Sequence, residues 1–272
     1  MKIDCYLPAI NLVLAIIFAG VSFIPFPAQS QQSYNTRVRF IQPTLEKEPE
    51  NRGAPNDRQG AGTRGDCPNV NIPLTALIPL RQQNLNQKQE KPINASPNQI
   101  SLGLTVNESP TFWFYFPYQP QEINSVKFVL LDEENNSVTQ EPIPITISET
   151  PGIISVRLPS TTKPLEIGKY YHWYFLVDCK PQSRTDDLSV EGLVKRVEPN
   201  SAIMSRLKTS KPEELVVMYA QAGIWQDAIS ILGELRRKHP QDPRLAADWQ
   251  DLLKSVDLSH IATQRITPCC HP

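Results

Sequence analysis

Glycine is scarce in this sequence, and its net charge is close to zero. It holds 11 glycines but 26 prolines in 272 residues, whereas proline usually makes up roughly 5% of a protein. Many prolines beside few glycines favour a β-rich chain with stiff connections and exclude a collagen-like or flexible glycine-rich one. The 27 Lys and Arg residues nearly balance the 28 Asp and Glu residues, for a formal net charge of −1. This balance argues against a nucleic-acid partner.

Recognisable catalytic and cofactor motifs are also missing. The chain has four histidines: His172, His239, His260 and His271. None of them is spaced with cysteines or carboxylates as in a zinc or iron site. A GxGxxG spacing that starts at Gly60 lacks the strand and helix that dinucleotide binding needs. We therefore predict no metal, no cofactor and no enzymatic activity. An unrecognised hydrolase stays an alternative, because paired carboxylates can meet in space from distant strands.

Long apolar runs are absent after residue 24. Before it, Lys2 precedes an uncharged apolar run over residues 7–24, and Pro25, Pro27 and the small residues Ala28 and Ser30 follow. This pattern predicts a signal peptide over residues 1–30 with cleavage after Ser30. A retained membrane anchor is the alternative, since about 18 apolar residues can just span a bilayer. We expect an extracytoplasmic protein, in the periplasm, the cell envelope or secreted, with no membrane span after cleavage.

Four cysteines remain after the predicted cleavage: Cys67, Cys179, Cys269 and Cys270. In an oxidising compartment four thiols allow three pairings, which the sequence alone does not separate. We favour a disulfide between Cys67 and Cys179. Adjacent Cys269 and Cys270 would pair only with strain, so free thiols or other partners stay open for them.

Short apolar runs between residues 72 and 198 indicate strands. Alternating residues predict strands over 100–106, 112–116, 126–131, 143–147, 154–158 and 170–179. Several short strands without intervening helices, a central Trp173 and a Cys six residues later predict an immunoglobulin-like antiparallel β-sandwich. A small barrel is the alternative. The polar segment 31–71 before it predicts a linker that carries a Gly/Arg loop.

Residues 199–262 change to a helical period, and residues 263–272 form a C-terminal tail. Ser210 and Glu213 match a capping box before an apolar helix face. One helical hairpin resembles a tetratricopeptide unit, followed by a capping helix, at these positions: Tyr219, Gly223, Trp225, Ala228 and Pro240. The resemblance implies a protein-interaction site at those residues. Because such arrays usually need three or more copies, helices that only pack on the sandwich or on each other are the alternative.

Aromatic residues are concentrated in two places, residues 112–118 and Tyr170, Tyr171 and Tyr174. Strand alternation sends about half of these rings to the core. The remainder could stack on sugars, which makes carbohydrate binding an alternative function.

Several longer strings are similar to a cyanobacterial family called domain of unknown function 928. The similar strings are residues 53–55, 60–67, 74–79, 110–115, 171–175 and 219–225. The resemblance spans about residues 50–262. It implies an exported protein and transfers no activity and no catalytic residues. It also implies that the Gly/Arg loop packs near the sandwich and is held by Cys67.

We therefore expect an exported, non-catalytic protein-interaction or structural module. Its expected partners are envelope or periplasmic proteins, with cell-surface glycans as the alternative.

The signal peptide gives a direct test. Intact mass analysis of protein recovered outside the cytoplasm should show a chain that begins at Gln31, because cleavage is expected after Ser30. A mass that retains Met1 would instead support the membrane anchor.

Overall fold

The computed structural model describes residues 38–45, 58–60, 67–82, 99–139, 141–180 and 188–267. The predicted signal peptide, most of the predicted linker, and Cys269 and Cys270 lie outside these ranges. Within them, no helix is both long and apolar enough to cross a membrane. The described sheets and helices belong to one compact unit, Thr36–Pro272.

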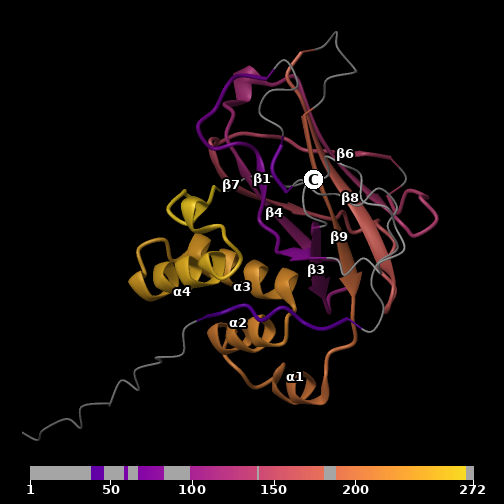
Figure 1. The fold of residues 1–272 in the computed structure, drawn as a ribbon, viewed down its shortest axis with the longest axis vertical. Coiled ribbons are helices and arrows are strands. Elements are labelled where there is room, and N and C mark those ends of the chain that lie inside the picture. Colours follow the sequence, from indigo (N-terminus) through magenta and orange to yellow (C-terminus); the bar gives the residue numbers. More distant parts are fainter. Residues whose placement is uncertain are drawn as a thin grey trace, which may run out of the picture. The chain divides into compact units, whose positions relative to one another are not determined.

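Strands come first along the described chain and helices follow (Figure 1). The strands are β1 (Thr75–Ala76), β2 (Leu80–Gln82), β3 (Gln99–Thr105), β4 (Thr111–Phe116), β5 (Ser125–Leu131), β6 (Ile143–Pro144), β7 (Gly152–Arg157), β8 (Tyr170–Asp178) and β9 (Leu188–Arg196). The α-helices are α1 (Ser201–Arg206), α2 (Pro212–Gln221), α3 (Trp225–Lys238) and α4 (Pro243–Lys254). Short 3-10 helices lie at η1 (Pro120–Glu122) and η2 (Ser259–Ile261).

The strands form two sheets, in the orders β1-β4-β7 and β2-β3-β9-β8-β5-β6. The predicted strands over 100–106, 112–116, 126–131, 154–158 and 170–179 are confirmed as β3, β4, β5, β7 and β8. The expectation of purely antiparallel pairing is wrong for one pair of the described strands, because β3 and β9 are parallel. A parallel pair needs a long connection, and here all the intervening strands supply it.

Aromatic side chains fill the space between the two sheets. From β4, Phe114 stacks on Phe175 of β8 with ring centroids 4.2 Å apart. The ring centroids of Phe112 and Phe128 of β5 are 4.7 Å apart. Trp173 is also fully buried here, and it fits because Gly192 of β9 has no side chain: a Cβ there would lie 2.3 Å from the Trp173 ring.

The opposite face of β4 packs on helices. Trp113 touches Gly233 of α3, where a Cβ would lie 2.3 Å from the indole ring, and its ring lies 6.1 Å from that of Trp249 in α4. The Trp113 indole N–H donates to Ser230 Oγ at 3.1 Å. The described chain therefore has three layers, with the three-stranded sheet between the six-stranded sheet and the helices (Figure 1).

The described parts of the predicted linker contribute a few buried side chains to the core, while other residues in them are exposed. Val38 is 2% exposed and Phe40 is 8% exposed. Arg58 is also buried, and its guanidinium donates to the carbonyls of Ile78 at 3.1 Å and Val256 at 2.8 Å. Arg58 thus connects the segment between β1 and β2 to the segment that follows α4.

The predicted C-terminal tail is also bound to the sheet where it is described. The Thr267 N–H donates to the Ile153 carbonyl at 2.8 Å, and the Ile153 N–H donates to the Arg265 carbonyl at 2.8 Å. Thr267 is fully buried. Residues 265–267 thus extend the edge of the three-stranded sheet beside β7.

The start of α2 differs from the expected capping box. The N-cap residue is Lys211, with no side-chain capping bond, and Pro212 occupies the first turn. Ser210 therefore lies outside the helix. The tolerance of a proline in the first turn explains why the helix starts here, since its missing N–H would have had no helical partner.

Asp227 joins the helical layer to the six-stranded sheet. It lies in the first turn of α3, and its Oδ2 accepts hydrogen bonds from Thr105 Oγ1 at 2.8 Å and the Val106 N–H at 3.1 Å. Desolvation raises the pKa of Asp227 to about 6, although these two hydrogen bonds act to lower it. The carboxylate therefore orients α3 at a cost in stability near neutral pH.

We expect Asp227→Asn to change how stability depends on pH. A pKa raised from 3.8 to about 6 contributes stability that is fully present below pH 3.8 and is lost as the pH rises through 6. The loss corresponds to roughly 3 kcal/mol at most. Asn keeps an acceptor for Thr105 and Val106 but does not ionise. Urea unfolding at pH 4 and pH 7 should show that the free energy of unfolding of the variant rises relative to that of the wild-type protein as the pH rises. If the two proteins differ in this free energy by the same amount at both pH values, the raised pKa of Asp227 is contradicted.

Candidate functional site

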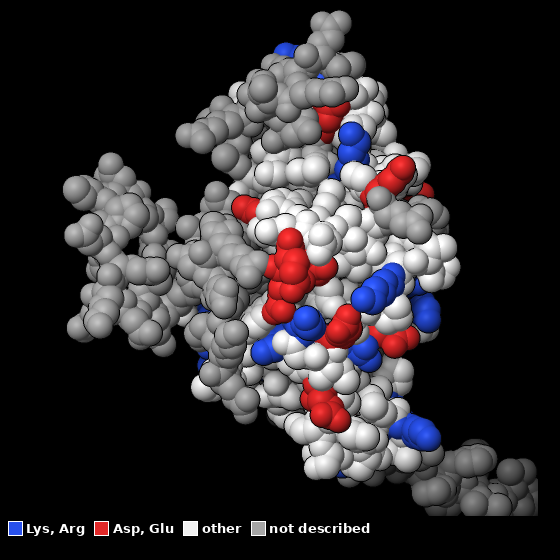
Figure 2. All heavy atoms as spheres, turned by 90° about the vertical axis from the view of Figure 1, so that its right-hand side faces the viewer, with Lys and Arg blue, Asp and Glu red and all other residues white. Residues whose placement is uncertain are grey.

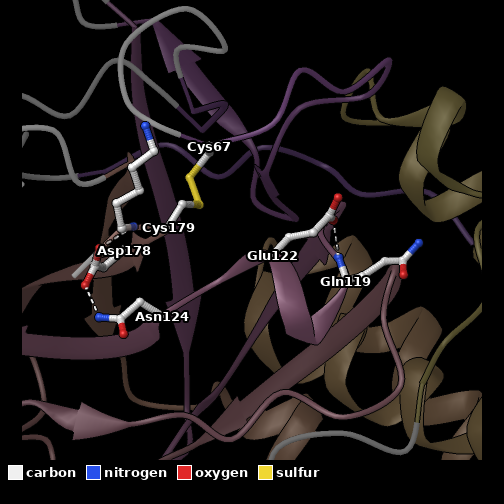
Figure 3. The surroundings of a disulfide bond; sticks show 7 residues. Cys67, Gln119, Glu122, Asn124, Asp178 and Cys179 are labelled. Atoms are coloured by element: carbon white, nitrogen blue, oxygen red, sulfur yellow. Dashed lines mark hydrogen bonds between the residues drawn. A yellow bond between two sulfur atoms is a disulfide. The ribbon is translucent and has the colours of Figure 1, made fainter. Parts of the chain in front are cut away.

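A disulfide joins Cys67 to Cys179, with the two Cα atoms 5.2 Å apart (Figure 3). This is the pairing favoured from the sequence. It attaches the segment before β1 to the end of β8. Beside it, Asp178 accepts from Asn124 Nδ2 at 2.6 Å and from the Lys180 N–H at 2.9 Å (Figure 3). A disulfide is consistent with an oxidising, extracytoplasmic location.

The predicted interaction residues lie in the α2–α3 hairpin and its continuation. Tyr219, Trp225 and Ala228 are buried, at 5%, 0% and 0% exposure. Gly223 lies in the turn between α2 and α3 with φ +74°, and Pro240 lies exposed between α3 and α4. In this conformation the three buried side chains contact the protein's own core. A role for the set in partner binding stays a prediction.

Alternation along β8 divides its aromatic residues between two faces. Tyr171, Trp173 and Phe175 point to the core and are buried, whereas Tyr170 and Tyr174 lie on the outer face and are partly exposed. The predicted division of these rings into core and surface is confirmed. For residues 112–118 the expectation that about half of the rings would lie outside the core is wrong. All of these rings are buried: Phe112, Trp113, Phe114, Tyr115, Phe116 and Tyr118.

A hydrogen-bonded group lies on the outer face of β8 and β9. Tyr174 Oη is 3.1 Å from His172 Nδ1, and His172 Nε2 is 2.9 Å from Glu191 Oε2. The His172 and Tyr174 rings have centroids 4.2 Å apart. At the start of β8, Tyr170 pairs with Lys195 of β9, and Lys195 Nζ lies 4.6 Å from the Tyr170 ring centroid. We call Tyr170, His172 and Tyr174 with Glu191 and Lys195 the outer row.

The His172 group is not arranged as an activated nucleophile. Desolvation, with the Glu191 charge and a hydrogen bond to it, raises the pKa of Tyr174 above its usual value. A nucleophilic phenolate would need the opposite shift. The Tyr174 hydroxyl therefore remains protonated and can donate to His172, which in turn can donate to Glu191. Such a hydrogen-bonded group of polar side chains can position a ligand.

A cavity of about 240 Å³ adjoins the outer row at Tyr170. It lies between the turn after β5 and the loop before β8, and five charged side chains among its lining matter here: Glu133, Glu134, Lys163, Glu166 and Lys169. The Tyr170 N–H donates to Glu133 Oε1 at 3.3 Å. This bond joins the turn to the first residue of the outer row.

Asp132 at the edge of this cavity has a structural role. Its Oδ1 accepts from the backbone N–H groups of Glu134 at 3.0 Å and Asn136 at 2.8 Å. Desolvation alone would raise its pKa, but these bonds outweigh it, and the pKa of Asp132 lies below its usual value. Across the described residues, no group of three His, Cys, Asp or Glu side chains is placed to hold a metal ion.

Sequence reasoning missed Glu191 and Lys195, because it missed β9. Leu188, Val190 and Val194 alternate along β9 and are buried, which is a strand signal. The intervening Gly192 weakens that signal. Without β9, neither partner of the β8 aromatic residues could be identified.

Removing the disulfide gives a direct test of its contribution. The bond closes a loop with a sequence separation of 112, which the chain-entropy treatment values at roughly 4 to 5 kcal/mol. We expect Cys67→Ser with Cys179→Ser to lower the free energy of unfolding by about 4 kcal/mol in urea titrations. Wild-type protein kept in reductant serves as the control and should lose a similar amount. An unchanged unfolding midpoint in both samples would count against this bond.

Comparison with known proteins identifies a family. A family model described as Domain of Unknown Function (DUF928) matches residues 59–266. Searches of the curated proteins and of the solved structures found no match. The family match includes every described strand and helix, as well as Cys67, Cys179 and the outer row. The chain belongs to the DUF928 family.

Proposed function

We propose that this protein is a non-catalytic, extracytoplasmic module that acts through protein contacts, and that its helices bind an extended polypeptide segment. The observation that carries the proposal is the way the helices hold residues 38–45 of the same chain. We call this segment the strap. Its contacts are those by which a helical hairpin receives an extended peptide.

The strap is held by one aromatic residue and by backbone hydrogen bonds. The Phe40 ring meets the Trp225 ring edge to face, with centroids 5.2 Å apart. The Phe40 N–H donates to Ser255 Oγ at 3.1 Å, and the Ile41 N–H donates to the Ala220 carbonyl at 3.0 Å. Backbone bonds hold a segment of almost any sequence, whereas the buried Phe40 supplies selectivity. This combination suits recognition of an extended peptide.

The turn between α2 and α3 is shaped to admit the strap. At Gly223 a Cβ would lie 2.6 Å from Pro43 Cδ and 2.9 Å from the Ile41 carbonyl oxygen. From the sheet side, Arg81 Nη1 donates to the Pro43 carbonyl at 2.6 Å. The groove thus has a helical wall and a wall from β2. Two of the predicted interaction residues, Gly223 and Trp225, contact the strap.

The finer fold assignments fit this proposal. We interpret α2 and α3 as a tetratricopeptide-like hairpin and α4 as its capping helix. We interpret the two sheets as an immunoglobulin-like sandwich, supported by the Tyr171 hydroxyl, which accepts from the Glu166 N–H at 2.9 Å. Tyrosines near the start of a late strand make such a bond in immunoglobulin-like domains.

An envelope or periplasmic location supplies the expected partners. The Cys67–Cys179 bond is consistent with such a compartment. We expect partners there to present an extended segment with an aromatic residue that can take the place of Phe40. Protein contacts are preferred over catalysis because the His172 group lacks an activated nucleophile and Asp227 is used to orient α3.

A peptide competition experiment tests the groove. We expect a fluorescent peptide with the sequence of residues 37–46 to bind Phe40→Ala protein at least roughly tenfold more tightly than wild-type protein, measured by fluorescence anisotropy. The reason is that the variant strap loses its aromatic anchor and leaves the groove open more often. Ile41→Ala is the matched control, because the Ile41 side chain is 53% exposed. It should bind the peptide as the wild-type protein does.

Arg81→Ala provides a second comparison, because Arg81 belongs to the groove itself: its removal should weaken the strap and the added peptide alike, so the peptide should bind this variant no more tightly than the wild-type protein. Equal peptide affinity for all four proteins, each with its folding checked by circular dichroism, would contradict the groove. Crosslinking of the tagged protein in native envelopes should recover partner proteins, with a higher yield for Phe40→Ala. A background yield for every variant would contradict a function through protein contacts.

A further inference from the structure

The outer row and the adjoining cavity form one continuous surface along β8. Tyr170 lines the cavity and begins the row. His172 and Tyr174 follow at alternate positions on the same outer face, and their rings pack together with centroids 4.2 Å apart. The surface therefore combines a small hollow with a line of partly exposed rings, a shape that fits the end and the following units of a linear ligand.

Two pairs of opposite charges lie at the cavity end of this surface. Lys163 Nζ lies 3.1 Å from Glu166 Oε1, and Lys169 Nζ lies 3.7 Å from Glu133 Oε2. His172 is within 2.9 Å of Glu191. Figure 2 views the molecule from the side of the six-stranded sheet and shows acidic and basic side chains next to each other rather than gathered by sign. Asp132 and Glu134 add two further carboxylates to the cavity, so the surface presents strong donors and acceptors with an excess of negative charge.

Matched pairs select against two classes of ligand. An anionic ligand would meet the excess carboxylates and would have to separate a pair to form its own, so it would gain little. A flat apolar protein surface would remove water from the charged groups without giving them new hydrogen bonds, which is costly. A hydroxyl group can donate to the carboxylate and accept from the ammonium of one pair at the same time. A neutral ligand rich in hydroxyl groups fits the pairs as they stand.

The aromatic side chains agree with that choice. The partly exposed rings of Tyr170 and Tyr174 offer apolar contact beside polar groups, and tyrosine combines both properties. Sugar rings have the matching character, with C–H faces and hydroxyl edges. We propose that the outer row and its cavity bind a neutral oligosaccharide, with one terminal sugar in the cavity and the next units along Tyr170, His172 and Tyr174.

This site is independent of the proposed peptide groove. The groove lies among the helices and β2, whereas the outer row lies on the face of β8 that points away from the three-stranded sheet. A protein that lacks one activity can therefore retain the other. Peptide binding by Phe40→Ala and sugar binding by the outer row are measured separately.

Titration calorimetry with soluble hexasaccharides tests the proposal. The mature protein is titrated with neutral hexamers of glucose, mannose and N-acetylglucosamine, and with a hexamer of galacturonic acid as the charged probe. We expect at least one neutral hexamer to bind with a Kd of about 1 mM or tighter. The charged hexamer should bind more weakly. Tyr170→Ala and Tyr174→Ala should each weaken the neutral hexamer roughly tenfold.

Lys127→Ala is the matched control. Lys127 lies exposed on β5 in the same sheet face but outside the outer row, so its removal should leave the Kd unchanged. Thermal unfolding of each variant confirms that the fold is intact. The proposal is overturned if no neutral hexamer binds, if the galacturonate hexamer binds more tightly, or if both tyrosine variants bind as well as the wild-type protein.

Discussion

The two-sided packing of β4 is the interaction on which the rest of the structure depends. Phe112 and Phe114 meet the rings of the six-stranded sheet, while Trp113 meets α3 and α4 on the opposite face. A strand buried on both faces does not alternate between polar and apolar residues, and β4 is accordingly a run of aromatic residues. The helices are for this reason part of the core and not an appended module. Removing them would expose Trp113 and its neighbours to water.

Alternating residues made much of the six-stranded sheet predictable. β5 and β8 bury every second residue, so their faces could be assigned from the sequence. In β4 both faces are apolar, and the period cannot say which face meets which layer. β9 was missed because Gly192 interrupts its pattern, and the reason for that glycine is the Trp173 ring of the neighbouring strand. The parallel pairing of β3 with β9 joins residues distant in sequence, which local patterns do not encode.

The candidate sites show the same limit. Spacing predicted a helical hairpin, and the structure contains α2 and α3 there. Spacing could not say whether small and aromatic residues at these positions face a partner or the protein's own chain. Phe40, which contacts Trp225, lies in a short segment of mostly polar composition. Its two buried residues, Val38 and Phe40, are too few to form a recognisable hydrophobic pattern in the sequence. For the outer row, the β8 residues were recognised, but their partners on β9 were not.

Asp227 explains how the proposed peptide groove and the sheet come to have fixed relative positions. An apolar residue there would avoid the cost of a desolvated carboxylate, but it would leave the Val106 N–H and the Thr105 hydroxyl without their acceptor. The carboxylate also lies in the first turn of α3, where the helix dipole favours negative charge. Two residues earlier, Trp225 receives the Phe40 ring, and its indole N–H donates to the Leu77 carbonyl at 2.8 Å. The same turn of α3 therefore binds β3, the segment after β1 and the strap, so a change in sheet position would alter the groove.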